Sequence, residues 1–230
     1  MNTWSVIIPT LWKSPRIKQL LYNLDKSDFI NEIILIDNNP KDKPSWYNSK
    51  DFNKLVYLPM SENIYVNPAW NLGVSIAKNE NIAISNDDIE WMPAEIFNDT
   101  IVSGDWTSIG MHRDNWNAVS SNSLVDLTPG AGWGCLILVK KSKWEPIPDN
   151  LKIWLGDRWI LAYNKNLTFH KPGFIKGEIS VTVGVTGSQT IDESQSPYSA
   201  VLHEDISNWL TYYKTDELMA RIQKNIEISK

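Results

Sequence analysis

Two adjacent acidic side chains are the first candidates for chemistry in this sequence of 230 residues. Asp87 and Asp88 follow Asn86 at the end of an apolar run over residues 81–85. Carboxylate oxygens suit hard cations such as Mg²⁺ or Mn²⁺, which proteins commonly share with a phosphate. A metal held there could neutralise a diphosphate leaving group as its charge develops. The structural alternative is a turn with a helix cap, because Asp is common in both.

Two further polar turns also follow apolar runs. Thr10 ends the run over residues 5–9, and Asp37 ends the run over 32–36 and precedes two Asn residues. An acceptor-rich turn of this kind suits hydrogen bonds to a nucleobase edge or to ribose hydroxyls. By itself the Asp37 turn is explained equally well by an Asx-turn, in which the side chain bonds nearby backbone.

A predicted helix over residues 69–78 carries two residues that helices disfavour, Asn71 and Gly73. Asn67 and Pro68 precede it as a natural N-cap and first helical residue. A close approach of the backbone to a ligand or to a neighbouring strand would explain Gly73.

These polar turns need a fold that brings them together. Apolar runs indicate strands over residues 5–10, 32–37, 54–58 and 81–85, and helical spacing indicates helices over 16–24 and 69–78. Runs that are apolar throughout are typical of a parallel sheet buried on both faces. We therefore predict a single α/β domain with a mostly parallel, Rossmann-like central sheet flanked by helices. Ligands bind such sheets beyond the carboxyl ends of the strands, where the three polar turns would converge.

The remaining elements are expected from shorter signals. Ser14 and Pro15 read as the N-cap and first position of the first helix. Residues 132–139 lead from a glycine-rich loop into a further strand. Residues 203–226 place apolar side chains on one face of a helix. We expect that face to pack on the core, with a homodimer interface as the alternative.

Taken together and in order, these motifs resemble family 2-type glycosyltransferases with the GT-A fold. The resemblance covers residues 4–165 and implies transfer of a sugar from a nucleoside diphosphate sugar, with a UDP-sugar expected first, to a hydroxyl acceptor. The segments that carry it are Ser5-Val6-Ile7-Ile8-Pro9-Thr10, Ile36-Asp37-Asn38, Trp70-Asn71-Leu72-Gly73, Asn86-Asp87-Asp88, Gly130-Ala131-Gly132-Trp133-Gly134 and Leu155-Gly156-Asp157-Arg158-Trp159.

The resemblance implies a donor site and a divalent metal. Asp88 would bind Mn²⁺ or Mg²⁺, and His170, at a predicted strand end, would be a further metal ligand. Asn86 stands where many relatives carry an Asp, which leaves the metal with one carboxylate fewer. The residues assigned to donor binding are Pro9, Thr10, Asp37, Asn71, Asn86 and Asp87.

The resemblance also implies a catalytic base. Asp157 occupies the position of the family's catalytic carboxylate, although Gly156 replaces the first member of the usual acidic pair. As general base, Asp157 would activate the acceptor hydroxyl for a displacement that inverts the anomeric carbon. The structural alternative pairs Asp157 with Arg158. Gly132 and Trp133 would approach the donor sugar or the acceptor.

Two other function classes stay open. A sugar-phosphate nucleotidyltransferase shares this kind of nucleotide-binding sheet but usually has a glycine-rich loop after the first strand, and residues 10–15 contain no Gly. A non-catalytic nucleotide- or sugar-binding module would account for the two imperfect acidic motifs. It predicts nucleotide binding without turnover.

The acceptor is not determined by the sequence, and a glycan or a hydroxymethylated DNA base would fit. Lys140, Lys141 and Lys143 beside Trp144 could follow a phosphate backbone, although such runs are usually a solvated face. The net charge of -5 argues against a surface that is basic throughout. Some phage glycosyltransferases modify hydroxymethylated DNA bases, so the resemblance is compatible with a phage origin. The Asn-, Lys- and Ile-rich composition resembles that of an AT-rich genome.

The chain is predicted to be one unit with functional subdivisions. Residues 1–100 would form the donor half, 101–200 the acceptor and catalytic half, and 201–230 a C-terminal helical segment. The single Cys135 cannot form an internal disulfide, which favours a reducing cytoplasm. The N-terminus reads as a strand and not as a signal peptide, and apolar segments fall short of the roughly 18 to 20 residues of a membrane span.

Overall fold

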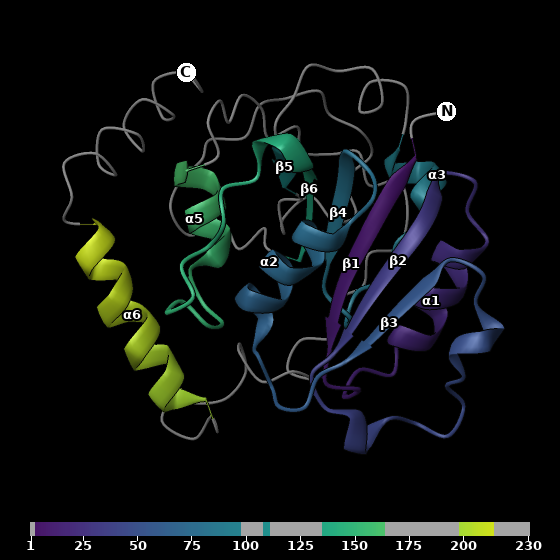
Figure 1. Cartoon of the computed structure of the whole chain (residues 1–230), viewed down its shortest axis with the longest axis horizontal. Helices are drawn as coiled ribbons and strands as arrows, with labels where there is room; N and C mark the ends of the chain where they lie inside the picture. Colours follow the sequence, from purple (N-terminus) through teal and green to yellow (C-terminus); the bar gives the residue numbers. More distant parts are fainter. Residues whose placement is uncertain (1–2, 98–107, 111–134, 164–197, 214–230) are drawn as a thin grey trace.

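The computed structural model describes residues 3–97, 108–110, 135–163 and 198–213 (Figure 1). Their centre is a six-stranded sheet in the order β3-β2-β1-β4-β6-β5. The strands β1 to β4 are parallel, and β6 runs antiparallel to both β4 and β5. The strands are β1 (Trp4–Thr10), β2 (Ile30–Asp37), β3 (Leu55–Pro59), β4 (Asn81–Ser85), β5 (Ser108–Gly110) and β6 (Leu136–Lys140). The predicted α/β class with a mostly parallel sheet is therefore confirmed.

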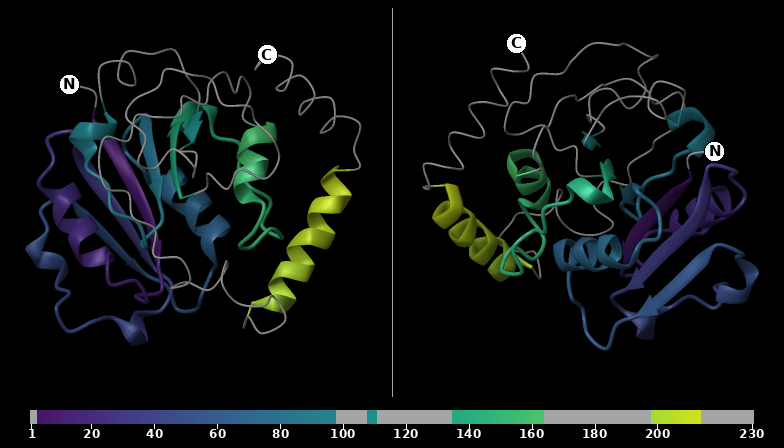
Figure 2. Two further views of the ribbon diagram at one scale, coloured as in Figure 1. Left: turned by 180° about the vertical axis from the view of Figure 1, so that it is seen from behind. Right: turned by 45° about the horizontal axis from the view of Figure 1, so that its top comes forward.

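Helices cover both faces of this sheet (Figures 1 and 2). On one face, Leu20, Leu21 and Leu24 of α1 join a buried cluster with alternate side chains of β1 and β2. On the other face, a second cluster joins the intervening side chains to α2, α5 and α6. The helices are α1 (Ile17–Asp25), α2 (Val66–Ile76), α3 (Pro93–Ile96), α5 (Gly156–Tyr163) and α6 (Ser199–Tyr213), and the short 3₁₀ turns are η1 (Pro40–Asp42), η2 (Ser49–Asp51) and η4 (Lys141–Lys143).

Gly73 lies where α2 crosses β1. A Cβ at this position would fall 2.4 Å from a side-chain carbon of Ile7. The helix can therefore lie close to the sheet only because residue 73 has no side chain. Of the two explanations offered for Gly73, the close approach to a neighbouring strand is confirmed.

Two helix caps predicted from sequence are wrong. The helix α2 begins at Val66, one residue before Asn67, whose buried side chain bonds the carbonyl oxygens of Leu151 and Trp154 and not the helix itself. The helix α1 begins at Ile17 without a side-chain cap. The hydroxyl of Ser14 instead accepts from the backbone N–H of Arg16, at 3.1 Å, within a turn. The partners of Asn67 are more than 80 positions away, outside the window that capping rules consider, whereas Ser14 bonds the backbone two residues on in a local turn.

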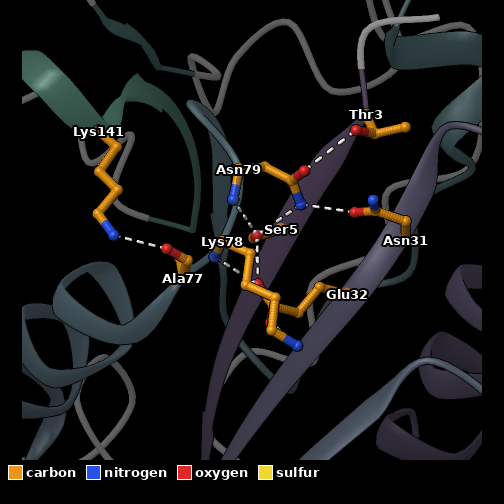
Figure 3. A network of polar contacts seen from close by, with 8 residues as sticks. All are labelled: Thr3, Ser5, Asn31, Glu32, Ala77, Lys78, Asn79 and Lys141. Carbon is orange, nitrogen blue, oxygen red and sulfur yellow. Dashed lines mark hydrogen bonds and ion pairs between the residues drawn. The ribbon is translucent and has the colours of Figure 1, made fainter.

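A polar network ties the amino ends of the parallel strands together (Figure 3). The Ser5 hydroxyl donates to the carboxylate of buried Glu32 at 2.6 Å, and the backbone N–H of Lys78 donates to the same oxygen at 2.8 Å. Burial opposes ionisation of Glu32, but these hydrogen bonds and the Lys78 charge hold its pKa below the ordinary value. Asn79 donates to the Ser5 hydroxyl at 2.8 Å. The network fixes the end of the sheet that is remote from the polar turns.

The lysine-rich stretch belongs to this remote end. Because β6 is antiparallel to β4, Lys140 pairs with Asn81, the first residue of β4, and its ammonium donates to the Asn81 side chain at 2.6 Å. The Lys141 ammonium donates to the carbonyl oxygens of Ser75 and Ala77 at 3.2 and 2.5 Å, at the end of α2 (Figure 3). A cation there stabilises the helix terminus. These two lysines therefore stabilise the fold.

Candidate functional site

The carboxyl ends of β1 and β2 lie side by side, and the turn after β4 joins them. Thr10 and Asp37 are partners in the parallel register. The backbone N–H of Asn38 donates to the carbonyl oxygen of Thr10 at 2.9 Å. The Thr10 hydroxyl donates to the carboxylate of Asp87 at 2.6 Å. The predicted convergence of the three polar turns is confirmed.

Asp87 and Asp88 are both buried at this end of the sheet. Burial raises the pKa of Asp87 to about 7; the charge of Asp88 adds to the rise, and the Thr10 hydrogen bond offsets part of it. The backbone N–H of Asn86 donates to the carbonyl oxygen of Cys135 at 2.9 Å, which fixes the start of the acidic turn against the strand β6. The turn is therefore held from two directions.

The chemistry of these side chains fits a hard divalent cation. Two neighbouring carboxylates at a strand end supply oxygen ligands, and a bound cation would lower the raised pKa of Asp87 and so favour its ionised form. Among the residues that the structure describes, no three His, Cys, Asp or Glu side chains are grouped for metal binding. The acidic pair would therefore hold a cation together with ligands from elsewhere, such as phosphate oxygens or water.

Asp37 is fully buried and shaped by two hydrogen bonds. One carboxylate oxygen accepts from the backbone N–H of Asn39 at 2.9 Å, so the Asx-turn is present. The other accepts from the hydroxyl of Tyr57 on β3 at 2.6 Å. Burial, together with this bond to Asp37, raises the pKa of the Tyr57 hydroxyl above its ordinary value. A carboxylate has further lone pairs, so Asp37 retains capacity to accept from a ligand.

Aromatic side chains that were not among the predicted site residues surround the Asp37 turn. The ring of Tyr47 lies 4.8 Å from that of Trp12 and 5.2 Å from that of Tyr57, between ring centroids. The Lys43 ammonium lies 5.5 Å from the centroid of the Tyr57 ring. Trp12 has a positive φ of 62°, a strained conformation that the surrounding contacts must maintain. The available signal was Trp12 itself, only two residues beyond Thr10.

The start of α2, with the two residues before it, connects the carboxyl end of β2 to the segment that precedes the predicted catalytic residue. The side chain of Asn38 accepts from the N–H of Ile64 at 3.3 Å and donates to the carbonyl oxygen of Tyr65 at 3.4 Å. Two residues later, Asn67 donates to the carbonyl oxygens of Leu151 and Trp154 at 3.1 and 3.2 Å. Hydrogen bonds therefore run from the end of β2 to the segment that precedes α5.

Asp157 lies in the first turn of α5. Burial raises the pKa of its carboxyl above the ordinary value, and the backbone N–H and charge of Arg158 offset part of the rise. One carboxylate oxygen accepts from that N–H at 2.8 Å. At the preceding position, a Cβ on Gly156 would fall 2.1 Å from the side-chain oxygen of Asn67. The space that a first acidic residue would need is therefore filled by Asn67.

The other predicted site residues have different outcomes. The side-chain amide of Asn71 donates to the carbonyl oxygen of Ile147 at 2.7 Å and accepts from the N–H of Ile147 at 3.0 Å and from the Trp144 ring N–H at 3.2 Å. These bonds account for Asn71 as an anchor of residues 144–147, and its contact with the donor stays a prediction. Pro9 lies in β1, paired with Ile36. The predictions for Gly132, Trp133 and His170 lie outside the described residues.

The sheet, its helical layers and the acidic turn at the strand ends define an α/β fold of the GT-A type. The family model for glycosyl transferase family 2 matches residues 5–120, which is half of the chain. The chain belongs to this family, and the predicted class of nucleotide-sugar-dependent glycosyltransferase is confirmed. No curated protein matches the whole sequence significantly.

Solved structures agree on the fold. Residues 1–349 of S. aureus TarS in complex with UDP align with a TM-score of 0.62 at 14% identity, covering 93% of this chain and 66% of that one. Glucosyl-3-phosphoglycerate synthase from Mycobacterium tuberculosis, in complex with Mn²⁺, UDP and glucosyl-3-phosphoglycerate, aligns with a TM-score of 0.58 at 12% identity, covering 91% and 79%. The chain spans 44% of a longer TarS structure. In the described part of the chain no helix is long and apolar enough to cross a membrane.

Proposed function

We propose that this enzyme transfers a sugar from a UDP-sugar to a hydroxyl acceptor, with inversion at the anomeric carbon. The observation that carries the proposal is the hydrogen bond of 2.6 Å between Thr10 and Asp87, which joins the acidic turn to the strand ends of a family 2 chain. UDP in the structures of S. aureus TarS and of the Mycobacterium tuberculosis synthase supports uridine as the nucleoside.

Donor binding is proposed for the ends of β1 and β2. Asp37 and Asn38 would accept from the uracil edge or ribose hydroxyls, and Pro9 and Thr10 would line the other side. The rings of Trp12 and Tyr57 border this region, and rings of this kind can stack on a base. Asn86 and Asp87 would lie along the diphosphate. Tyr57 already fixes the orientation of the Asp37 carboxylate, and because Asp37 has no exposed surface, a group that covers it must move when the donor binds.

Asp88 would hold the divalent cation, with Asp87 beside it as a second source of negative charge. A bound cation of this kind supplies charge stabilisation to the departing diphosphate. The protein's part is positioning. Thr10 fixes Asp87, and the Asn86 backbone is anchored to Cys135, so the carboxylates stay in place as the leaving group develops charge. Mn²⁺ in the Mycobacterium tuberculosis structure supports a metal of this class.

Asp157 would act as general base. Its pKa, raised by burial, brings the carboxylate closer to the operating pH, where proton transfer is most effective. The carboxylate would take the proton of the acceptor hydroxyl while that oxygen bonds to the anomeric carbon. The bond from that carbon to the nucleoside diphosphate breaks on the opposite face. The products are an inverted glycoside and a released nucleoside diphosphate, with Asp157 left protonated.

A glycan hydroxyl is favoured over a DNA base as acceptor. Lys140 and Lys141, which motivated the nucleic-acid interpretation, are bonded to Asn81 and to the end of α2 at the opposite end of the sheet. A phosphate backbone following them would lead away from Asp88 and Asp157. The cytoplasmic location, the phage origin and the homodimer stay predictions from the sequence.

The test is calorimetric titration of the protein with UDP, GDP and TDP, each with and without Mn²⁺. We expect UDP to bind most tightly, with a metal-dependent component that Asp88→Ala removes. Asp28→Ala is the matched control, since it deletes an exposed carboxylate that precedes β2 at the remote end of the sheet. Failure of all three nucleotides to bind the folded wild-type chain would contradict the proposal.

A further inference from the structure

The segment that precedes Asp157, residues 151–155, is held by a buried carboxylate from the far end of the chain. Asp205 lies on α6 with none of its surface exposed. Its two oxygens accept from three successive backbone N–H groups, those of Lys152 at 2.7 Å, Ile153 at 2.8 Å and Trp154 at 2.9 Å. Bonds to a charged acceptor are stronger than neutral ones, so this carboxylate fixes the local backbone.

Asn67 holds the same segment from the opposite side. Its amide donates to the carbonyl oxygens of Leu151 and Trp154, and its backbone N–H donates to the carbonyl oxygen of Lys152 at 3.0 Å. Asp205 of α6 therefore bonds the backbone N–H groups of this segment, and Asn67 of α2 bonds its carbonyl oxygens. Such a segment has little freedom to move relative to α2.

The fixed segment ends directly at Asp157. Leu155 has a positive φ of 66°, a conformation disfavoured for a residue with a Cβ, which persists only where neighbouring contacts enforce it. Gly156 follows in contact with Asn67, and Asp157 is next. The direction in which α5 begins, and therefore the position of the Asp157 carboxylate, depends on this turn.

Packing of α6 against the rest of the protein does not account for the buried charge of Asp205. Trp209, four residues after Asp205 on the same helix, is buried in the apolar cluster, and the ring of Tyr212 lies 5.2 Å from that of Trp159 on α5. These apolar contacts already dock the helix. A buried carboxylate is costly without hydrogen bonds. Here Asp205 accepts from three successive backbone N–H groups in the segment just before the proposed base.

We propose that Asp205 and Asn67 are positioning residues, which hold residues 151–155 so that the Asp157 carboxylate is aligned for proton transfer. The inference rests on the proposed role of Asp157. It also assigns the helix α6, in the C-terminal part of the chain, a part in shaping the active site (Figure 1). Neither residue touches substrate in this proposal.

The first test compares Asp205→Asn with Glu204→Gln in the full chain. Glu204 is the neighbouring acid on α6, and it makes an exposed ion pair with Lys152 at 3.0 Å. UDP release from UDP-glucose, UDP-galactose and UDP-N-acetylglucosamine, with water as acceptor, supplies the turnover assay. We expect Asp205→Asn to lower kcat about 100-fold, the scale of a misplaced catalytic group. The Kd for UDP should stay unchanged, and Glu204→Gln should match wild type.

The pH profile separates positioning from a general loss of stability. A loosened segment admits water to Asp157, which weakens the burial that raises its pKa. The acid limb of kcat should therefore move to lower pH in Asp205→Asn. A variant that was only less stable would keep the limb in place. Wild-type kcat together with a wild-type acid limb would overturn the inference.

Amide hydrogen exchange gives a readout without turnover. We expect faster exchange at residues 152–157 in Asp205→Asn than in Glu204→Gln, with exchange in β1 and β2 unchanged. Asn67→Ser tests the same segment from α2 and serves alone if Asp205→Asn does not fold. Unchanged exchange in the folded variants overturns the inference. Wild-type turnover in Asp157→Asn instead overturns the proposed base, whatever the exchange result, so the two failures are distinguishable.

Discussion

The hydroxyl of Thr10 and the carboxylate of Asp87 lie 2.6 Å apart, although 77 positions separate them in the sequence. Thr10 ends β1 and Asp87 follows β4, the neighbouring parallel strand. The bond is buried, and the same hydroxyl oxygen accepts from the backbone N–H of Trp12 at 2.9 Å. Thr10 therefore connects the carboxyl end of β1, the acidic turn and the strained Trp12.

Replacing this threonine should weaken both the fold and the donor site. Thr10→Val keeps the side-chain shape but leaves the Asp87 carboxylate and the Trp12 N–H without their partner, which costs about 1–3 kcal/mol. Urea denaturation measures the loss. Thr3→Val is the control, because the Thr3 hydroxyl, just before β1, makes a part-buried bond of 3.0 Å to Asn79. A loss in Thr3→Val as large as in Thr10→Val would contradict this role.

Asp87 should make the metal-free protein less stable as pH rises. Its pKa is about 7 in the folded chain against an ordinary value of 3.8, so folding favours the protonated form. The protonated Asp87 carboxyl contributes fully to the free energy of unfolding below pH 4, and this contribution is lost as pH rises through 7. The two pKa values correspond to a difference of about 4 kcal/mol.

The measurement compares wild type with Asp87→Asn by urea denaturation in EDTA between pH 4 and 8. The variant keeps an acceptor for Thr10 but cannot ionise. Wild type should lose stability relative to the variant as pH rises. Saturating Mn²⁺ with UDP should reduce the difference, because a cation favours the ionised carboxylate. A difference that does not vary with pH would show that Asp87 titrates in its ordinary range.

Much of the sheet was predictable because its strands are apolar throughout. The run at residues 81–85 coincides with β4, and the helix predicted over residues 16–24 matches α1 to within one residue at each end. Asn67 was assigned a local cap because its partners, Leu151 and Trp154, are more than 80 positions away. Local propensity carries no information on such contacts.

Asp205 shows what limited the prediction of the site. Its helix was expected from the apolar spacing, but a single Asp on a helix is normally solvated. The one available signal is its spacing from Trp209, which puts the carboxylate on the buried side of α6. The three backbone N–H donors that make this acceptable belong to a turn whose conformation the sequence does not reveal.

Gly156 and Asn67 should show coupled effects on stability. A methyl group at residue 156 would overlap the Asn67 side-chain oxygen, so Gly156→Ala should cost about 1–3 kcal/mol. Asn67→Ser shortens the opposing side chain and should recover part of that cost in the double variant. A double-mutant cycle by urea denaturation measures the coupling, expected at about 0.5–3 kcal/mol. Strict additivity of the two substitutions would mean that the overlap is relieved elsewhere.

Tyr57 should contribute to nucleotide binding through Asp37 and not through its own contact alone. Its hydroxyl holds one Asp37 oxygen at 2.6 Å, so Tyr57→Phe frees that carboxylate to rotate while keeping the ring. The loss of one such bond is worth about 1 kcal/mol, or roughly a fivefold weaker Kd for UDP. Tyr47→Phe is the matched control, because the neighbouring Tyr47 hydroxyl is buried without a hydrogen-bond partner among the described residues. Calorimetry should show a weaker Kd for Tyr57→Phe only. Equal effects of the two substitutions on the Kd would mean that the aromatic cluster as a whole contributes to UDP binding. An unchanged Kd in Tyr57→Phe would show that the orientation of Asp37 by Tyr57 does not contribute to UDP binding.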